Sequence, residues 1–310
     1  MTTLSDPTPA YAAVDWGTSS FRLWLIGGDG AVIAERRSGE GMTVAARTGF
    51  AEVLAGHLAA VSAPKDLPVL ICGMAGAKQG WVEAGYLDTP AALSAIPAAA
   101  VRVPGVAADI RILPGLAQRD PAAPDVMRGE ETQLLGAAAE LGDGDRLVCM
   151  PGTHSKWVRL SGGAVSGFST FMTGELFEAI SAHTILSHSV AGAGTVSGGS
   201  EAFRAAVAET VAAPALATNR LFSVRAGGLI AGLSAEDARA RLSGTLIGLE
   251  IAGALSLAAP DTPVALVVSG GLGALYREAL AAAGISPTLI DADAAVRRGL
   301  AAGAQALWSL

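Results

Sequence analysis

The chain has 310 residues, of which 51% are hydrophobic and 16% charged, and its formal net charge is −7. This composition supplies ample apolar material for a core and argues against disorder. Because there is no basic run, the acidic balance disfavours a nucleic-acid partner. The N-terminus does not resemble a signal peptide, and no apolar segment makes an unbroken membrane span. We therefore expect a cytoplasmic protein without a membrane partner.

In the first half, apolar patterns and turn residues predict strands and helices in chain order. These are strands near 11–17, 21–27 and 31–37, a helix at 49–61, short strands at 69–72 and 111–113, and a helix at 130–141. The Ala- and Pro-rich segment 86–110 gives no clear assignment.

The second half is predicted to contain two strands joined by a turn over 146–160, a strand at 164–171, helices near 174–188, 199–212 and 235–257, a strand at 264–268, a helix from about 274, a strand at 287–290 and a helix at 294–307. Strands that alternate with helices predict an α/β architecture. Cys72 and Cys149 each follow an apolar run, so we expect buried free thiols.

The segment 12–26, AAVDWGTSSFRLWLI, predicts a hairpin with a polar tip. Gly17 allows a ligand to approach the backbone, and Thr18 and Ser19 offer hydroxyl and N–H donors. Asp15 stands at the mouth of the turn, where a carboxylate can hold Mg²⁺ through water. The pattern suits the triphosphate of ATP with its metal, although an ordinary turn of small polar residues is the alternative.

This opening pattern returns at residues 146–160, RLVCMPGTHSKWVRL. The matched pairs are Gly17 with Gly152, Thr18 with Thr153, and Ser20 with Ser155. Such a repeat predicts two similarly folded halves, each of which opens with a β-meander. We place the domains at residues 1–143 and 144–310, and expect the last helix to pack back on the first domain.

A third glycine turn, Ser269-Gly270-Gly271-Leu272-Gly273, follows the apolar strand at 264–268. A Gly-Gly pair that opens a helix lets an adenosine lie against the backbone, although a strand-to-helix turn also needs glycine for structural reasons. The chain has neither a GxxxxGK[ST] loop nor a GxGxxG fingerprint.

Five segments, VDWGTSSFRLWL, MRGEETQLLGA, MPGTHSKWVRL, FMTGELFEAI and VSGGLGALYREAL, resemble the 2-dehydro-3-deoxygalactonokinase family. The resemblance runs from about residue 11 to the end. It implies two ribonuclease-H-like domains of the actin-like ATPase type, facing an interdomain cleft. It also implies ATP-dependent phosphorylation of 2-dehydro-3-deoxy-D-galactonate at the C6 hydroxyl, a step in galactonate breakdown.

The resemblance also implies the ligands of each motif, with ATP and Mg²⁺ as cofactors. Asp15, Gly17, Thr18 and Ser19 fall on the first phosphate motif of the superfamily. The second phosphate motif and the adenosine motif fall on Gly152, Thr153, His154, Gly270 and Gly271.

Related sugar kinases carry Gly-Asp-Gln before a helix, where this chain has Gly129-Glu130-Glu131. We therefore expect Glu130 to be the general base, with Glu131 as the fallback. The alternative is structural, since the dipole of a helix favours acids in its first turn.

A sugar-acid substrate requires a group that binds its carboxylate, and Arg128 and Arg22 are the candidates. For Arg22 the more common fate, a solvated surface side chain, is slightly favoured. Ala75, Gly76 and Trp81 are expected to line the sugar pocket, and core packing explains them equally well. Lys156 is expected to be solvated rather than to reach a phosphate, and Thr173 to cap a helix.

Two rival functions stay open. One is a kinase of the same fold that acts on another sugar or sugar acid, and the other is a non-catalytic, ATP-switched actin-like module. The sequence does not distinguish the galactonate-derived acid from its gluconate-derived epimer, and it leaves open whether the chain forms a homodimer.

Overall fold

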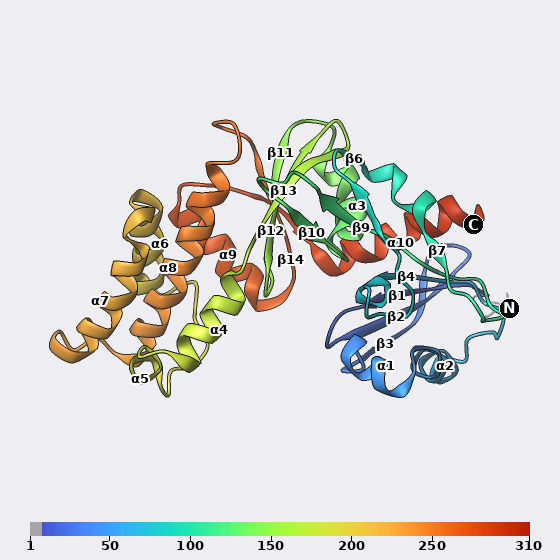
Figure 1. Ribbon diagram of the computed structural model, residues 1–310, viewed down its shortest axis with the longest axis horizontal. Helices are drawn as coiled ribbons and strands as arrows, with labels where there is room; N and C mark the ends of the chain where they lie inside the picture. The colour runs from blue at the N-terminus through green and yellow to red at the C-terminus, as the bar shows by residue number, and fades with distance from the viewer. Residues whose placement is uncertain (1–7) are drawn as a thin grey trace, which may run out of the picture. The chain divides into compact units, whose positions relative to one another are not determined.

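The computed structural model describes residues 8–310 and divides the chain into two compact units (Figure 1). Within the described residues, unit 1 comprises residues 8–143, 163–166 and 292–310. Unit 2 comprises residues 144–162 and 167–291. Each unit is described by itself.

Unit 1 is built on a six-stranded mixed sheet with the order β3-β2-β1-β4-β8-β7. Its strands are β1 (Pro9–Trp16), β2 (Phe21–Gly27), β3 (Val32–Ser38), β4 (Val69–Gly73), β7 (Val101–Arg102) and β8 (Ile110–Ile112). The first three form an antiparallel meander, and β1, β4 and β8 run parallel. In the parallel register Asp15 lies beside Cys72 and Trp16 beside Gly73, so the carboxyl ends of β1 and β4 meet at one edge.

The segment that the sequence left unassigned is irregular because it forms only short elements. These are β5 (Tyr86–Asp88), β6 (Ala91–Ala92), η2 (Leu93–Ala95), η3 (Pro97–Ala99) and β7, and η1 (Met74–Gly76) comes before the segment. β5 joins β9 (Gly115–Gln118) and β10 (Asp125–Met127), two strands that we did not predict, in a small second sheet. Strands of three or four residues are too short for a readable alternation of polar and apolar residues.

Four helices complete unit 1, namely α1 (Met42–Thr48), α2 (Phe50–Ala60), α3 (Glu130–Leu141) and α10 (Ala292–Trp308). The last helix packs against α3 through two glycines. A Cβ at Gly299 would overlap the backbone carbonyl oxygen of Thr132, and one at Gly136 would overlap that of Ala295. The two backbones therefore touch at this crossing.

The sheet of unit 2 repeats the topology of unit 1. Its strands are β11 (Arg146–Met150), β12 (Ser155–Ser161), β13 (Ala164–Phe171), β14 (Val264–Val268) and β15 (Thr288–Asp291), in the order β15-β14-β11-β12-β13. β11 pairs antiparallel with β12 and parallel with β14, as β1 does with β2 and β4. The start of β13 also pairs with β6, within residues 163–166 of unit 1. The predicted structural repeat is confirmed.

The helices of unit 2 are α4 (Thr173–His183), α5 (Ser187–Val190), α6 (Glu201–Ala212), α7 (Ala217–Ile230), α8 (Ala235–Leu255) and α9 (Gly270–Ala282), with the short turn η4 (Pro214–Leu216). α8 is buried on most sides, and α6 lies against Gly244 and Gly248. Three predictions were wrong. The helix near 174–188 breaks into α4 and α5, α7 was missed, and α9 begins at Gly270 because the glycine-rich segment is its first turn.

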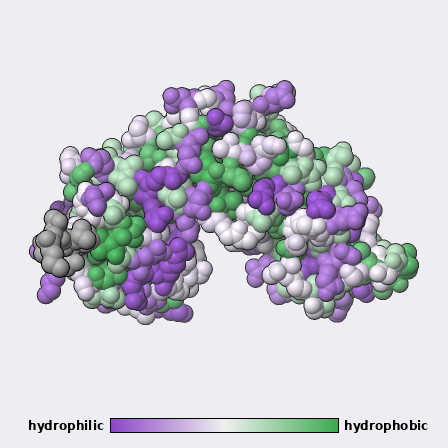
Figure 2. All heavy atoms as spheres, turned by 180° about the vertical axis from the view of Figure 1, so that it is seen from behind, coloured by the Kyte–Doolittle hydropathy of each residue, from purple (hydrophilic) through white to green (hydrophobic). Residues whose placement is uncertain are grey.

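Both cysteines are buried and free, as predicted. Apolar side chains are exposed on α7 of unit 2 at Phe222, Leu229 and Ile230, at an edge that Figure 2 shows as hydrophobic. None of the helices in residues 8–310 combines the length and hydrophobicity needed to cross a bilayer.

Candidate active site

The first Gly-Thr turn of unit 1 presents its polar residues to the outside. Thr18 and Ser19 are exposed and Gly17 is half-buried. The start of α1 supports the turn from behind, because the Met42 N–H donates to the Gly17 carbonyl (2.9 Å) and the Thr43 N–H to that of Thr18 (3.1 Å). The carbonyl groups of Gly17 and Thr18 are thus bound to protein, while the side chains of Thr18 and Ser19 are exposed.

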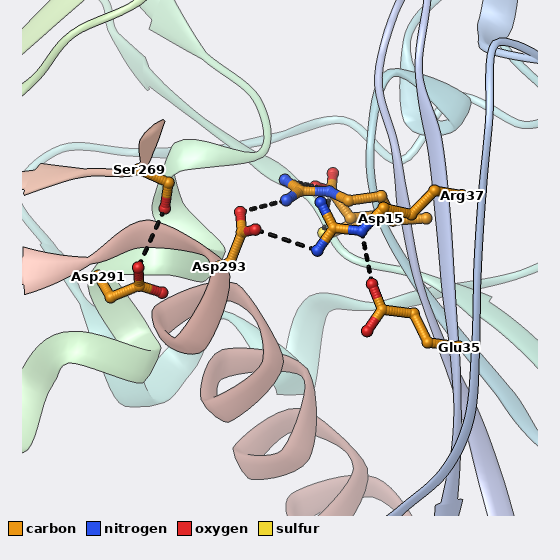
Figure 3. A network of polar contacts seen from close by, with 8 residues as sticks. Asp15, Glu35, Arg37, Ser269, Asp291 and Asp293 are labelled. Atoms are coloured by element: carbon orange, nitrogen blue, oxygen red, sulfur yellow. Dashed lines mark hydrogen bonds and ion pairs between the residues drawn. The ribbon is translucent and has the colours of Figure 1, made fainter. Parts of the chain in front are cut away.

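Asp15, at the end of β1, is held by an arginine. Arg22 Nη2 and Nε donate to Asp15 Oδ2 at 2.6 and 3.1 Å. Arg22 Nη1 also donates to Asp293 in the first turn of α10, and Asp293 accepts from Arg37 Nη2 at 3.1 Å (Figure 3). Desolvation works against the charge of Arg22, but Asp15 and Asp293 outweigh it and raise the pKa of Arg22.

The side chain of Arg22 is only 21% exposed. The prediction that Arg22 is a solvated surface side chain is therefore wrong. Two carboxylates already accept hydrogen bonds from Arg22, and its role in binding a substrate carboxylate stays a prediction.

The turn before α3 lies directly against the end of β4. A Cβ at Gly129 would come 3.6 Å from the Cα of Gly73, and a Cβ at Gly73 would come 2.7 Å from the carbonyl oxygen of Trp16. Gly129 has φ of +107° and Gly73 of +90°, conformations in which side chains other than hydrogen are strained. Glycine at both positions therefore lets the Glu130 turn approach the Asp15 strand.

The two acids of the α3 start have different environments. Glu130 is half-buried, and its Oε2 accepts from the Arg128 N–H at 3.1 Å. Glu131 is fully buried and accepts from the Gly129 N–H at 2.6 Å and from the Thr132 hydroxyl at 2.9 Å. Desolvation, reinforced by the neighbouring charge of Glu130, raises the pKa of Glu131 to about 8.

Arg128 lies beside residues that we expected around the sugar pocket. Its guanidinium stacks on Tyr86 at 4.5 Å, and Nη2 donates to the Gly85 carbonyl at 2.8 Å. Its Nε and Nη1 are buried and have no hydrogen-bond partner among residues 8–310. A Cβ at Gly76 would lie 2.8 Å from Nη1, so glycine at this position makes room for the guanidinium. Buried donors without partners are costly, and a bound carboxylate would satisfy them.

The other residues expected around the sugar have packing roles. Ala75 is buried, and its carbonyl oxygen accepts from the Trp81 N–H at 2.7 Å. The Trp81 ring stacks on Phe50 at 6.1 Å and lies edge-on to Trp16 at 6.3 Å. A role of Trp81 in sugar binding stays a prediction.

In unit 2, two predicted nucleotide motifs border one pocket of about 520 Å³. Gly152 of the second turn and Gly271 of the adenosine motif both line it. A Cβ at Gly271 would meet nothing within 4 Å, so open space lies in front of this backbone. Gly270, with φ of +68°, is exposed beside it. A pocket of this size with glycine backbone at its wall suits a nucleoside.

The start of α4 braces the second turn. The Glu175 N–H donates to the Thr153 carbonyl at 3.2 Å, and Glu175 Oε2 contacts Nε2 of the exposed His154 at 2.6 Å. A Cβ at Gly174 would lie 2.8 Å from the Gly152 carbonyl oxygen. That turns of both units hold one ATP stays a prediction.

Two minor predictions in unit 2 were wrong. Lys156 is 7% exposed rather than solvated, because its Nζ donates to the Thr170 hydroxyl at 2.9 Å. Thr173 does not cap α4, because the N-cap position is Met172 and the Thr173 hydroxyl instead bonds the buried Glu250.

Sequence reasoning missed several polar residues of this pocket. Arg239, on α8, lines it and stacks on Phe177 at 5.0 Å. Tyr276 also lines the pocket and donates to Glu250 at 2.8 Å. Arg239 stands in no motif, and nothing within VSGGLGALYREAL singles out Tyr276, so only the folded chain brings these two residues to one pocket.

The carboxylate side chains present suit a Mg²⁺ ion that is bound largely through water rather than one enclosed by protein ligands. Within the described part of the chain, no group of three or more His, Cys, Asp or Glu side chains could hold a metal ion. Mg²⁺ commonly keeps several waters and binds one or two carboxylates plus substrate phosphates. Asp15, half-buried beside the phosphate turn, meets that need.

The repeated sheet, the two Gly-Thr hairpins and the Gly-Gly helix start define a class, namely two-unit α/β proteins of the actin-like ATPase type. Comparison with known proteins then identifies the family. The family model described as 2-keto-3-deoxy-galactonokinase matches residues 15–302. This chain belongs to the 2-keto-3-deoxy-galactonokinase family, as the sequence motifs predicted.

Relatives support this membership. The chain is 68% identical over 300 residues to the probable 2-dehydro-3-deoxygalactonokinase DgoK1 of Rhizobium meliloti, covering 97% of this chain and 98% of that protein. It is 36% identical over 302 residues to the 2-dehydro-3-deoxygalactonokinase of Escherichia coli, covering 97% and 99%. A crystal structure of a protein assigned as a 2-dehydro-3-deoxygalactonokinase from Sinorhizobium meliloti superposes with a TM-score of 0.95 at 68% identity, over 97% of this chain and all of that one.

Proposed function

We propose that this protein transfers the γ-phosphoryl group of ATP to the C6 hydroxyl of 2-dehydro-3-deoxy-D-galactonate, giving the 6-phosphate and ADP. Family membership supports the reaction type and the substrate. The observation that carries the proposal is the meeting of the Asp15 strand end with the Glu130 turn at Gly73. Phosphoryl transfer needs little covalent help from protein and depends on such positioning.

Glu130 is the proposed general base. Its carboxylate accepts the proton of the C6 hydroxyl while the hydroxyl oxygen bonds to the γ-phosphorus and the bond to the ADP oxygen breaks. Glu131 is a poor alternative, because its carboxyl group is fully buried and accepts hydrogen bonds from the Gly129 N–H and the Thr132 hydroxyl. We assign Glu131 the role of holding the Gly129 turn.

Arg128 is the proposed binding group for the substrate carboxylate. Two of its guanidinium nitrogens have no partner within residues 8–310, and its stacking on Tyr86 fixes the plane in which they can donate. A planar guanidinium matches a carboxylate in bidentate fashion.

Gly17, Thr18 and Ser19 are proposed to contact the phosphates together with Gly152, Thr153 and His154, and Gly270 and Gly271 to contact the adenosine. The pocket lined by Gly152 and Gly271 supports the nucleoside part of this assignment. Asp15, oriented by Arg22, would hold Mg²⁺ through water, and the metal would supply neutralisation of the charge on the β- and γ-phosphates. A kinase of this kind would act in the cytoplasm, where ATP is available, in galactonate breakdown.

A coupled ADP-release assay over a panel of acceptors tests the proposal. The panel contains 2-dehydro-3-deoxy-D-galactonate, its gluconate-derived epimer, a neutral hexose and an amino sugar. We expect the highest kcat/KM with the galactonate-derived acid. Preference for a neutral or amino sugar would favour the first rival function, and ADP release that ignores every acceptor would favour the ATP-switched module.

A further inference from the structure

A buried carboxyl group lies in the middle of α8, where the proposed reaction does not use it. Glu250 is 1% exposed and sits in the most completely buried helix of unit 2. Burying an ionisable group costs free energy unless hydrogen bonds compensate. Glu250 has them, because Trp157 Nε1 and the Tyr276 hydroxyl each donate to it at 2.8 Å.

The partners of Glu250 come from the elements that carry the two nucleotide motifs. Tyr276 lies on α9, in the second turn after the Gly270-Gly271 pair, and lines the pocket. Trp157 lies on β12, two residues after Ser155, the residue that ends the second phosphate turn. The Ser155 and Tyr276 hydroxyl oxygens are 3.0 Å apart, which closes a chain of hydrogen bonds between β12, α8 and α9.

A fourth element, α4, joins this hydrogen-bond network through Thr173, whose hydroxyl also bonds Glu250. Thr173 begins α4, and the next residue, Gly174, packs on the backbone of Gly152 and Thr153. One carboxyl group therefore connects the phosphate turn, the helix that braces it and the helix of the adenosine motif.

Burial affects the ionisation of Glu250. Desolvation raises its pKa above the ordinary value, against the lowering effect of its hydrogen bonds. Each oxygen of Glu250 accepts one of these hydrogen bonds, and a hydroxyl group such as that of Tyr276 can act as donor or acceptor. Fully satisfied buried networks restrict the directions in which their members can point, which an apolar core does not.

We propose that Glu250 is a positioning residue of the nucleotide site, which fixes Tyr276 and the 151–155 turn in the geometry that binds ADP and ATP. This inference rests on the proposed nucleotide-dependent function. It adds a residue that contacts neither substrate nor metal and acts through Tyr276, Ser155 and Thr173. A network that serves only stability would affect the folding of unit 2 without a selective effect on nucleotide affinity.

Isothermal titration of ADP into the whole protein tests the inference, with three variants and one control. Glu250→Gln keeps a carbonyl acceptor and amide donors in the same shape, so we expect ADP affinity within about threefold of wild type. Glu250→Met removes them at similar volume, and we expect affinity to fall about 10- to 100-fold, as for loss of a buried network member. Tyr276→Phe should weaken ADP binding about 5- to 30-fold. Glu209→Gln, on the exposed side of α6, is the matched control.

The KM for the sugar acid should stay unchanged in every variant that binds ADP weakly. Wild-type ADP affinity in Tyr276→Phe, or a loss in Glu250→Gln as large as in Glu250→Met, would overturn the inference. Tyr276→Phe decides the matter if Glu250→Met fails to fold, since it removes a single oxygen. Wild-type protein that binds ADP without phosphorylating any sugar acid would contradict the proposed function but not the role of Glu250.

Discussion

At the scale of single residues, the proposed phosphoryl transfer depends on which acid at the start of α3 takes the proton. Replacing Glu130 by Gln keeps the side-chain shape and the acceptor for the Arg128 N–H, but it removes the base. We expect kcat for ADP release to fall about 100- to 10,000-fold with little change in KM for the sugar acid. Glu140→Gln on the exposed side of the same helix is the control and should behave as wild type. Full activity of Glu130→Gln would refute the assignment.

Arg128 gives a second residue-scale prediction. Arg128→Gln removes the positive charge and the paired N–H donors of the guanidinium. We expect kcat/KM for the sugar acid to fall about 10- to 150-fold. This range corresponds to the loss of about 1.5–3 kcal/mol from a hydrogen bond to a charged group. ADP affinity should be unaffected. Arg119→Gln, an exposed arginine next to the same small sheet, controls for a general loss of positive charge. Equal loss with an uncharged acceptor sugar would argue against carboxylate recognition.

The buried Glu131 predicts a pH dependence of stability. Its pKa is 4.5 as a free group and about 8 in the folded chain, so the folded state binds more protons between these values. The free energy of unfolding should therefore decrease as pH rises from about 5 to 8, by up to about 1.4 kcal/mol per pH unit from this group. In Glu131→Gln this contribution disappears, and chemical denaturation at several pH values should show a flatter profile. Parallel profiles for variant and wild type would contradict the burial argument.

These residues also show which parts of the candidate site can be predicted from the sequence. Gly17, Thr18 and Asp15 form a local turn, so their common location could be predicted from spacing alone. The pairing of Arg22 with Asp293 joins residues 271 positions apart, and no local pattern indicates it. For the same reason Glu250 attracts notice in the sequence only as a charge within an apolar helix.

At the scale of elements, the glycine contact between α3 and α10 fixes the helix that carries Glu130 and the helix that carries Asp293. A methyl group at Gly299 would overlap the Thr132 carbonyl oxygen, which is backbone and cannot rotate away. We expect Gly299→Ala to destabilise unit 1 by about 1–3 kcal/mol, as over-packing does. Gly56→Ala, at an exposed site in α2 with nothing within 4 Å, should be neutral or stabilising by up to about 1 kcal/mol. Thermal unfolding that ranks the two variants in the opposite order would contradict this packing.

The elements themselves were predictable where their patterns are long. The strand-turn-strand repeats at 12–26 and 146–160 and the helix at 130–141 have enough residues to show a period, and the helix at 235–257 contains a long apolar run. β5, β9 and β10 have three or four residues each, and the exposed α7 has a weak apolar stripe, so neither left a readable signal. The small sheet that carries Tyr86 beside Arg128 therefore appears only in the folded chain.

At the scale of the whole molecule, the duplicated topology explains why two turns of the same kind occur 135 residues apart. The copies are not equivalent, because the second hairpin carries Met150 where the first carries Asp15. We attribute the carboxylate-dependent part of the chemistry to unit 1, which also holds Glu130 and Arg128. The pocket of unit 2, between the second turn and the adenosine motif, is assigned to the nucleoside.

The most direct test of the phosphoryl transfer is to identify its product by nuclear magnetic resonance. The protein is incubated with ATP, Mg²⁺ and 2-dehydro-3-deoxy-D-galactonate, and ³¹P–¹H correlation locates the new phosphate ester. We predict one phosphomonoester coupled to the two protons of the C6 methylene group, formed in step with ADP. Phosphate on a secondary hydroxyl, or inorganic phosphate released with the sugar acid unchanged, would contradict the account.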